Sequence, residues 1–144
     1  MSLVWRDQLS VGNDVIDSDH RYLIEIINRV ERSLGVQNQS ELSAALDSLS
    51  QYSKVHFVRE EKIARAAGYT QVPGLSKSHD NLLTQLGQVR REIEEMGQEW
   101  SPTAVDHFTN LLRSWLVDHV IKEDLLMKPV LQRYYPDFDG ETQR

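Results

Sequence analysis

Apolar residues recur at intervals of three and four along most of the chain, which is the spacing of an amphipathic α-helix. Four such stripes can be followed, and they cover about residues 15–35, 40–68, 75–96 and 101–133. Gly35, Gly68 and Gly97 each follow the end of a stripe, where glycine commonly ends a helix. Ser40 and Ser101 come at the start of the second and fourth stripes, and we expect each serine to be an N-cap.

Only short segments separate the four stripes, and no strand pattern interrupts them. This order predicts an all-α fold, an antiparallel up-down-up-down four-helix bundle with an N-terminal arm that Trp5 anchors. We expect residues 1–144 to form a single domain, with the arm at 1–12, the bundle at about 13–133 and a loose polar tail at 134–144.

Composition excludes several classes of protein. The net charge is −6 and lysine and arginine do not cluster, so binding to nucleic acid is not expected. No apolar run approaches the roughly 20 residues that span a bilayer, and the N-terminus lacks the layout of a signal peptide. We therefore expect a cytoplasmic protein with no membrane segment. Because the chain has no cysteine, imidazole and carboxylate groups would have to bind any metal, and they suit iron, manganese, zinc or copper.

Four of the five histidines fall on apolar stripes, one on each predicted helix. They are His20, His56, His79 and His119, whereas we expect the fifth, His107, at the surface. A lone histidine on an apolar face is usually a hydrogen-bonded structural residue. Four of them together with Glu60, one helical turn after His56, would bury many donors and acceptors without partners. The pattern therefore predicts a metal site inside the bundle.

Ferritin-like bundles also hold metal pairs, but they use repeated Glu-x-x-His spacing and mostly carboxylate ligands. The predicted core stripes contain no such spacing, and their polar residues are mainly histidines. The ferritin-like interpretation is therefore disfavoured.

The chain resembles a bacterial hemerythrin over nearly its whole length. The matching pieces, in order, are Trp5, Asp17-Ser18-Asp19-His20, His56-Phe57-Val58-Arg59-Glu60-Glu61, Gly68-Tyr69, His79, Trp115-Leu116-Val117-Asp118-His119 and Asp124. Each piece alone has little specificity, but this order on these predicted helices is specific.

The resemblance implies a non-haem di-iron centre that takes up dioxygen reversibly and is not an enzyme. It implies two iron ions with a bridging oxo or hydroxo group as cofactors, and dioxygen or another small exogenous ligand as partner; no protein partner is indicated. The implied metal ligands are His20 and His56 for one iron, His79 and His119 for the other, and Glu60 and Asp124 as bridges. Trp115 and Leu116 would line the ligand pocket by the same resemblance, with ordinary core packing as the alternative.

One implied pair is awkward on a regular helix. His119 and Asp124 are five residues apart, which rotates them by about 140° relative to each other. Glu123, four residues after His119, would face it more directly and is the alternative bridge. A π-bulge could bring Asp124 round, since such bulges gather at functional sites. We choose Asp124.

The chain also departs from the family at Leu75. Hemerythrins usually supply a further histidine one turn before the position of His79, and leucine cannot bind a metal. The resemblance then implies a more symmetric centre with an additional open position, which water or an anion would fill. We expect weaker binding of the second iron, faster autoxidation or a preference for another ligand.

Three functions are compatible with these residues. The first is a di-iron protein that binds dioxygen for storage, delivery or sensing. The second is an enzyme whose opened iron activates oxygen, peroxide or nitric oxide. The third is an altered or degenerate site that holds one metal, or a different metal, for a structural or signalling role.

Overall fold

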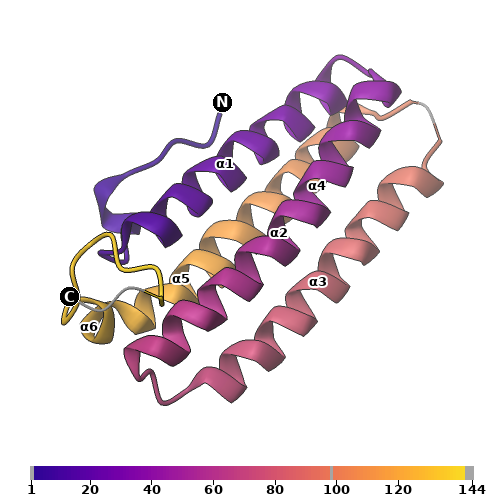
Figure 1. The fold of residues 1–144 in the computed structure, drawn as a ribbon. Coiled ribbons are helices and arrows are strands. Elements are labelled where there is room, and N and C mark those ends of the chain that lie inside the picture. Colours follow the sequence, from indigo (N-terminus) through magenta and orange to yellow (C-terminus); the bar gives the residue numbers. More distant parts are fainter. Residues whose placement is uncertain (1, 98, 142–144) are drawn as a thin grey trace.

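The computed structural model describes residues 2–97 and 99–141. Within them the chain forms helices and no strand, and the predicted all-α four-helix bundle is confirmed (Figure 1). The first three long helices are α1 (Asp14–Gly35), α2 (Gln39–Ala67) and α3 (Val72–Glu95). The fourth is a composite of α4 (Pro102–Ser114), the π-helical segment η2 (Trp115–Ile121), α5 (Lys122–Asp124), the 3-10 turn η3 (Leu125–Met127) and α6 (Lys128–Leu131). A short 3-10 turn, η1 (Asp7–Leu9), lies in the N-terminal arm.

Local side chains fix where the helices start. Ser101 accepts a hydrogen bond from the Ala104 amide and caps α4, as the sequence predicted. The predicted cap of α2 was wrong, because the Asn38 side chain accepts from the Glu41 amide and Ser40 lies within the helix. The third helix begins at Val72, three residues before the expected start near residue 75, and Pro73 lies in its first turn, where proline is tolerated.

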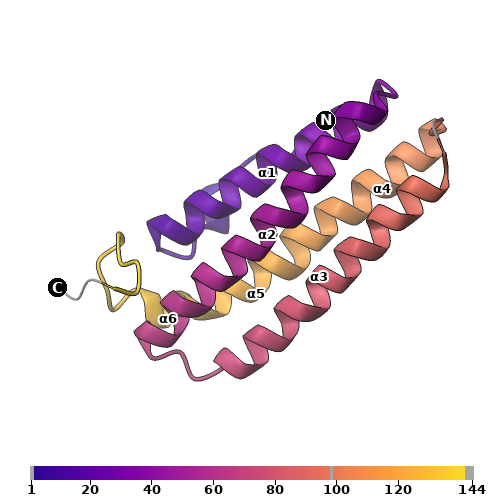
Figure 2. The same cartoon turned by 45° about the vertical axis from the view of Figure 1, so that its right-hand side comes forward.

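The four long helices lie alongside one another and alternate in direction (Figures 1 and 2). Helix α1 packs on α2 and on α4, and α2 packs on α3. Each helix turns one face to a common interior, so side chains from four separate segments of the sequence meet there. None of the helices in the described part of the chain is both long and apolar enough to cross a membrane.

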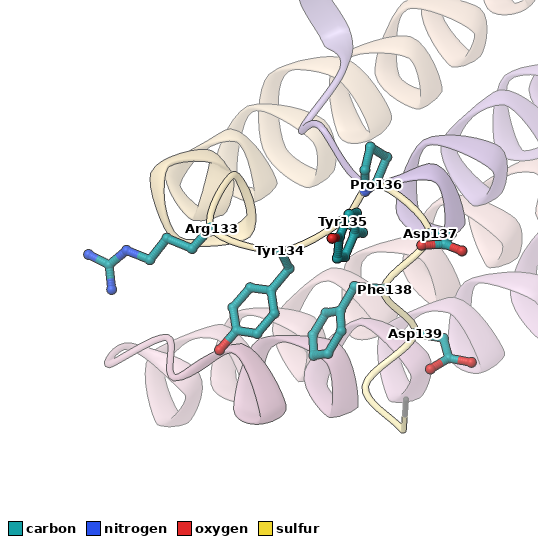
Figure 3. Close-up of a pocket in the computed structure, with 7 residues that line it drawn as sticks. All are labelled: Arg133, Tyr134, Tyr135, Pro136, Asp137, Phe138 and Asp139. Atoms are coloured by element: carbon teal, nitrogen blue, oxygen red, sulfur yellow. The ribbon is translucent and has the colours of Figure 1, made fainter. Parts of the chain in front are cut away.

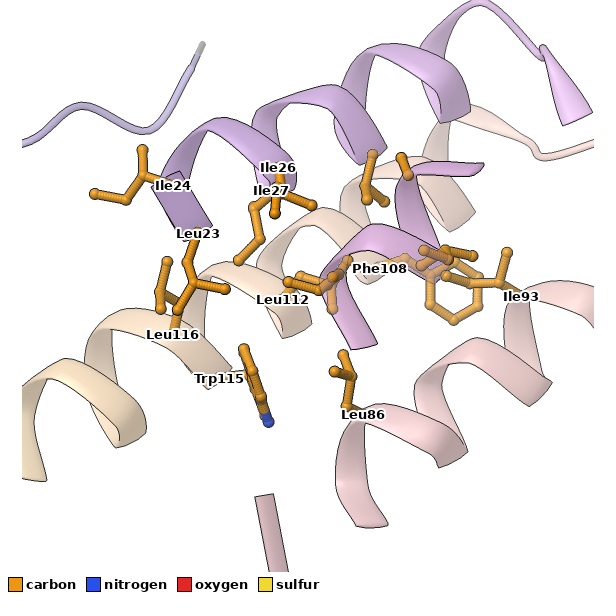
Figure 4. Close-up of a cluster of buried hydrophobic side chains, with 14 of the residues drawn as sticks. Leu23, Ile24, Ile26, Ile27, Leu86, Ile93, Phe108, Leu112, Trp115 and Leu116 are labelled. Atoms are coloured by element: carbon orange, nitrogen blue, oxygen red, sulfur yellow. The ribbon is translucent and has the colours of Figure 1, made fainter. Parts of the chain in front are cut away.

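The interior contains two apolar clusters. Part of the main cluster is drawn in Figure 4, where Leu23, Ile27, Leu112 and Leu116 are among the labelled residues. Phe57, Leu82 and Ile121 also belong to this cluster. The end cluster lies where the C-terminal segment meets the bundle and includes Val11, Ile16, Ile63, Leu75, Met127, Leu131 and Phe138. The separation of the two clusters leaves a layer between them for polar side chains.

Contacts with the bundle hold part of the segment that we expected to be a loose polar tail, and residues 142–144 of that tail lie outside the described part. Phe138 is 6% exposed, its ring stacks on Tyr134, and its carbonyl accepts a hydrogen bond from the Asn13 side chain. The Asp14 amide also donates to the Pro136 carbonyl. Apolar burial and these two bonds hold the segment against the start of α1, which a polar composition did not reveal.

Candidate metal centre

Five of the six predicted metal ligands lie in the layer between the two apolar clusters. On each helix, a polar residue stands between one member of the main cluster and one member of the end cluster. The polar residues are His20 on α1, Glu60 on α2, His79 on α3 and Asp124 on the fourth helix. Their neighbours in the main cluster are, in the same order, Leu23, Phe57, Leu82 and Ile121, and their neighbours in the end cluster are Ile16, Ile63, Leu75 and Met127. Because the helices run side by side, these helical spacings bring the polar residues to one level of the bundle.

Four of these side chains form one compact group, which we call the inner cluster: His20, His56, Glu60 and Asp124. Their candidate ligand atoms all lie within 4.8 Å of one another, and all four residues are buried. The Nε2 atom of His20 is 2.7 Å from Asp124 Oδ2 and 3.9 Å from Glu60 Oε2. The Nε2 atom of His56 is 2.9 Å from Glu60 Oε2 and 3.7 Å from Asp124 Oδ2.

These separations fit one metal ion. Ligand atoms bound at about 2.1 Å in tetrahedral or octahedral geometry stand roughly 3 to 3.5 Å apart, close to the observed range. The buried His56 Nε2 and Glu60 Oε2 atoms make no hydrogen bond of good geometry, although only 2.9 Å separates them. Two buried polar atoms that approach without bonding leave a desolvation cost, which a shared cation would offset.

Asp19 orients His56 from the side away from the inner cluster. Its Oδ2 atom accepts a hydrogen bond from His56 Nδ1 at 2.9 Å, while Arg59 donates to both of its oxygens and Tyr52 donates to Oδ1. Burial alone would raise the pKa of Asp19, but the bonds from His56, Arg59 and Tyr52 hold it well below its usual range. The charged carboxylate therefore fixes the ring with Nε2 directed at the inner cluster.

No role was assigned to Asp19, Arg59 or Tyr52 from the sequence. The signal was present, since Arg59 follows His56 by three residues and Tyr52 precedes it by four, so all three lie near one side of α2. The spacing of residues within α2 cannot predict that Asp19, which lies on α1, contacts this side of α2.

The inner cluster is strongly coupled electrostatically. Burial raises the pKa of Asp124 and the negative charge of Glu60 raises it further, while burial lowers the pKa of His20. For Glu60 and His56, burial opposes both pKa shifts. The attraction between the carboxylate and the imidazolium nevertheless lowers the pKa of Glu60 and raises the pKa of His56. A divalent cation would compensate two carboxylate charges that are otherwise confined in a dry interior.

His79 lies beside the inner cluster and contacts it through one carboxylate. Its Nε2 atom is 3.1 Å from Glu60 Oε1, and its Nδ1 atom is 2.8 Å from Glu61 Oε2. The Phe57 ring stacks on the imidazole with 4.0 Å between the ring centroids. Burial would lower the pKa of His79, but the bonds to both carboxylates raise it.

The structure contradicts the prediction that His119 lies on the core face, because its side chain is exposed. The π-helical turn is the reason. In this turn Trp115 and Val120, five residues apart, are both buried, as are Leu116 and Ile121. The wider turn gives residues 120 and 121 the inward positions that a regular α-helix would have given to 119 and 120. It also places Asp124 inward, so the expected π-bulge brings in Asp124 but carries His119 out.

The remaining predicted residues are also placed. Glu123, the alternative bridge, is only half-buried and accepts a hydrogen bond from Ser78. His107 is exposed, as expected. Trp115 and Leu116 are buried in the main cluster, and the Trp115 indole donates to the Leu82 carbonyl, so both serve in core packing.

A surface pocket of about 580 Å³ lies away from the inner cluster, along residues 133–139 of the C-terminal segment (Figure 3). It contains none of the predicted metal ligands. The chemistry of the chain is therefore concentrated in the buried layer and not in this hollow.

A buried group of histidines and carboxylates contributed by several helices defines a metal-binding four-helix bundle. More particularly, the chain belongs to the hemerythrin family, because the family model of the hemerythrin HHE cation binding domain matches residues 11–131.

Individual relatives agree with this assignment. The chain is 26% identical over 141 residues to a bacteriohemerythrin of Stenotrophomonas maltophilia, covering 98% of this chain and 89% of that protein. It is 27% identical over 122 residues to a bacteriohemerythrin of Pseudomonas aeruginosa, covering 85% and 76%. A crystal structure of a hemerythrin leucine-to-alanine variant shares the fold, with a TM-score of 0.76 at 24% identity and coverage of 91% and 98%.

Proposed function

We propose that this chain binds iron at the inner cluster and that the bound iron takes up dioxygen, or a ligand of similar size, for storage, delivery or sensing. The convergence of four buried donor atoms on one point between two apolar clusters carries the proposal. Membership of the hemerythrin family supports binding of metal and oxygen in general. Iron and dioxygen are the specific choices, since imidazole with carboxylate is a donor set that iron accepts.

Each part of the chain has a defined task in this proposal. The inner cluster would hold the iron, which when bound would supply the position for the small ligand. Asp19 keeps the His56 ring in the ligating orientation through the bond to Nδ1. The apolar residues on both sides, Leu116 and Ile63 among them, exclude bulk water from the ligand. A role in binding, with no catalytic turnover, is part of the proposal.

The resemblance implied a pair of irons with a bridging oxo or hydroxo group. A second iron would need ligand atoms on the side of Glu60 that faces away from the inner cluster. Among the described histidines, His79 is the one placed at that side of the carboxylate. The proposal therefore requires an iron centre but not a particular number of ions.

The test is a spectroscopic titration. Metal-free protein is loaded with iron(II) under argon, exposed to dioxygen and then degassed, while the visible spectrum is recorded. We expect iron to stay with the protein through desalting and dioxygen to produce a charge-transfer band that degassing reverses. Protein that retains no iron, or iron whose spectrum ignores dioxygen, would contradict the proposal.

His56→Ala is the informative variant, because it removes one ligand and leaves Glu60 without its nearest partner. We expect it to lose iron binding and the dioxygen-dependent spectrum together. His107→Ala is the matched control, since it removes an exposed histidine that is not part of the inner cluster. The His107 ring contacts Phe108, and the variant should behave as the unmodified protein.

A further inference from the structure

We infer that the centre is built for one metal ion, held by the inner cluster, and that the place beyond Glu60 lacks the ligands to hold a second. This inference rests on the proposed function, of which it specifies the metal stoichiometry. It differs from the paired irons that the family resemblance implies, and three features of this chain carry it.

The first feature is that the inner cluster is complete by itself. Two imidazole nitrogens and two carboxylate oxygens from three helical segments surround one point, with cross-distances of 2.7 to 3.9 Å. Four protein ligands of this kind suffice to bind a first-row divalent metal. One ion can therefore be held without help from residues outside the group.

The second feature is the composition of α3, the helix that faces the other side of Glu60. His79 contacts the inner cluster, and its two ring nitrogens lie within 3.1 Å of carboxylate oxygens of Glu60 and Glu61. One turn earlier stands Leu75, which is 3% exposed and packs in the end cluster. His79 thus acts as a positioning residue for Glu60, and no neighbouring nitrogen on α3 adds to it.

The third feature is the outward position of His119. Its side chain lines a groove between α3 and the fourth helix together with Gln85, Gln88 and Glu92. Turning it inward would require regular α-helical register across η2, in which residues 119 and 120 would take the inward positions that Val120 and Ile121 now hold. In the observed register of η2, Asp124 reaches the inner cluster and His119 does not.

A second ion would therefore find the single imidazole of His79 and the remaining carboxylate oxygen of Glu60, Oε1, where the inner cluster offers two imidazoles and two carboxylates. Its other positions would face apolar side chains such as Leu75 and Ile63, and water would have to fill them. Bringing that much water and charge into an apolar layer is unfavourable. The structure therefore assigns one strong metal position per chain.

The experiment measures iron per chain in the full-length protein. Metal-free protein is incubated with excess iron(II) under argon, desalted and analysed for iron and protein. A sample oxidised afterwards is examined by electron paramagnetic resonance. We expect one iron per chain and the signal of an isolated high-spin ferric ion. Two irons per chain with a spin-coupled, silent ferric state would overturn the inference while leaving the proposed function in place.

Three variants sharpen the result. His119→Ala should keep one iron per chain, because the residue is at the surface, and His79→Gln should also keep one, because glutamine can still donate to Glu60. His20→Ala should reduce the value to near zero. Loss of one of two irons in His119→Ala or His79→Gln would overturn the inference. No iron in the unmodified protein would contradict the proposed function and this inference together.

Leu75→His adds the donor that α3 lacks, and we expect it to raise the value above one iron per chain. Because histidine at a buried apolar position can destabilise the fold, thermal unfolding of this variant is recorded beside the iron analysis. A folded Leu75→His protein that still holds one iron would contradict the argument from α3.

Discussion

Asp19 holds one side chain of the proposed metal centre, the imidazole of His56, in its orientation. It is 4% exposed and joins α1 to α2 through His56, Tyr52 and the two bonds from Arg59. A carboxylate that accepts from a ligating histidine increases the basicity of the ring and fixes its tautomer. The consequence of removing its charge should therefore be seen in metal affinity as well as in stability.

We predict that Asp19→Asn weakens iron(II) binding by about 10- to 100-fold, because the amide is a poorer acceptor for His56 Nδ1 and no longer attracts Arg59. We also expect the free energy of unfolding to fall by about 1–3 kcal/mol, since buried donors lose their partner. Competition with a chelator of known affinity measures the first effect, and urea unfolding measures the second.

Glu31→Gln provides the control for Asp19→Asn. Glu31 accepts two bonds from Arg113, at 2.6 and 2.8 Å, so it resembles Asp19 as the acceptor of a two-pronged arginine contact. Glu31 lies on α1 eleven residues after His20, about three helical turns away, and its loss should lower stability without changing metal affinity. Equal metal affinity in Asp19→Asn and the unmodified protein would show that Asp19 serves stability alone.

At the scale of the elements, the π-helical segment η2 decides which side chains reach the centre. Its i→i+5 hydrogen bonds span one residue more than those of the α-helix on either side, and the exposed Asp118 lies in its middle. Deletion of Asp118 would allow this segment to form regular α-helix. Val120 and Ile121 would then be the third and fourth residues after Leu116. Both would remain inward, and Asp124 would follow them.

We therefore predict that deletion of Asp118 preserves iron(II) binding and changes the free energy of unfolding by no more than about 1 kcal/mol. Deletion of Lys54, an exposed residue of the regular helix α2, should have the opposite effect. The deletion rotates the part of α2 after residue 54 by about 100° relative to the part before it, because α2 is a regular α-helix without a π-turn that could lose one residue. Iron analysis and thermal unfolding of both deletions check this, and loss of iron after deletion of Asp118 would refute it.

The same contrast explains how far the sequence could predict the structure. The four helices were predictable because their apolar stripes follow the α-helical period, and the stripes also placed His20, His56, Glu60 and His79 inward. His119 was misplaced by that same rule, since one extra residue in η2 changes which positions face inward. Asp124 was placed correctly only with the help of the family resemblance and a supposed bulge. The pairing of supporting carboxylates with histidines, such as Asp19 with His56, depends on contacts between helices. Such contacts leave no periodic pattern in the sequence, so they could not be predicted from it.

At the scale of the whole molecule, the proposed metal centre is a layer of titratable groups between two apolar clusters, so its protonation is linked to folding. In the metal-free protein, attraction by carboxylates raises the pKa of His56 and of His79 above the ordinary value of 6.5, although burial opposes both shifts. Their stabilising contribution is complete below that value and is lost as the pH rises through the raised pKa values. His20 acts in the opposite direction, because burial lowers its pKa.

Metal binding has the reverse dependence, since the imidazoles and Asp124 must release protons before they bind an ion. We predict that the increase in Tm produced by a fixed excess of iron(II) grows between about pH 6 and about pH 8, where histidine titrates. Paired thermal scans under argon, with and without iron(II), measure the increase at each pH. His56→Ala should show little increase at any pH, which separates binding at the inner cluster from weak binding at surface carboxylates. An increase in Tm that stays constant or shrinks toward pH 8 would mean that iron binding does not displace protons from this buried layer.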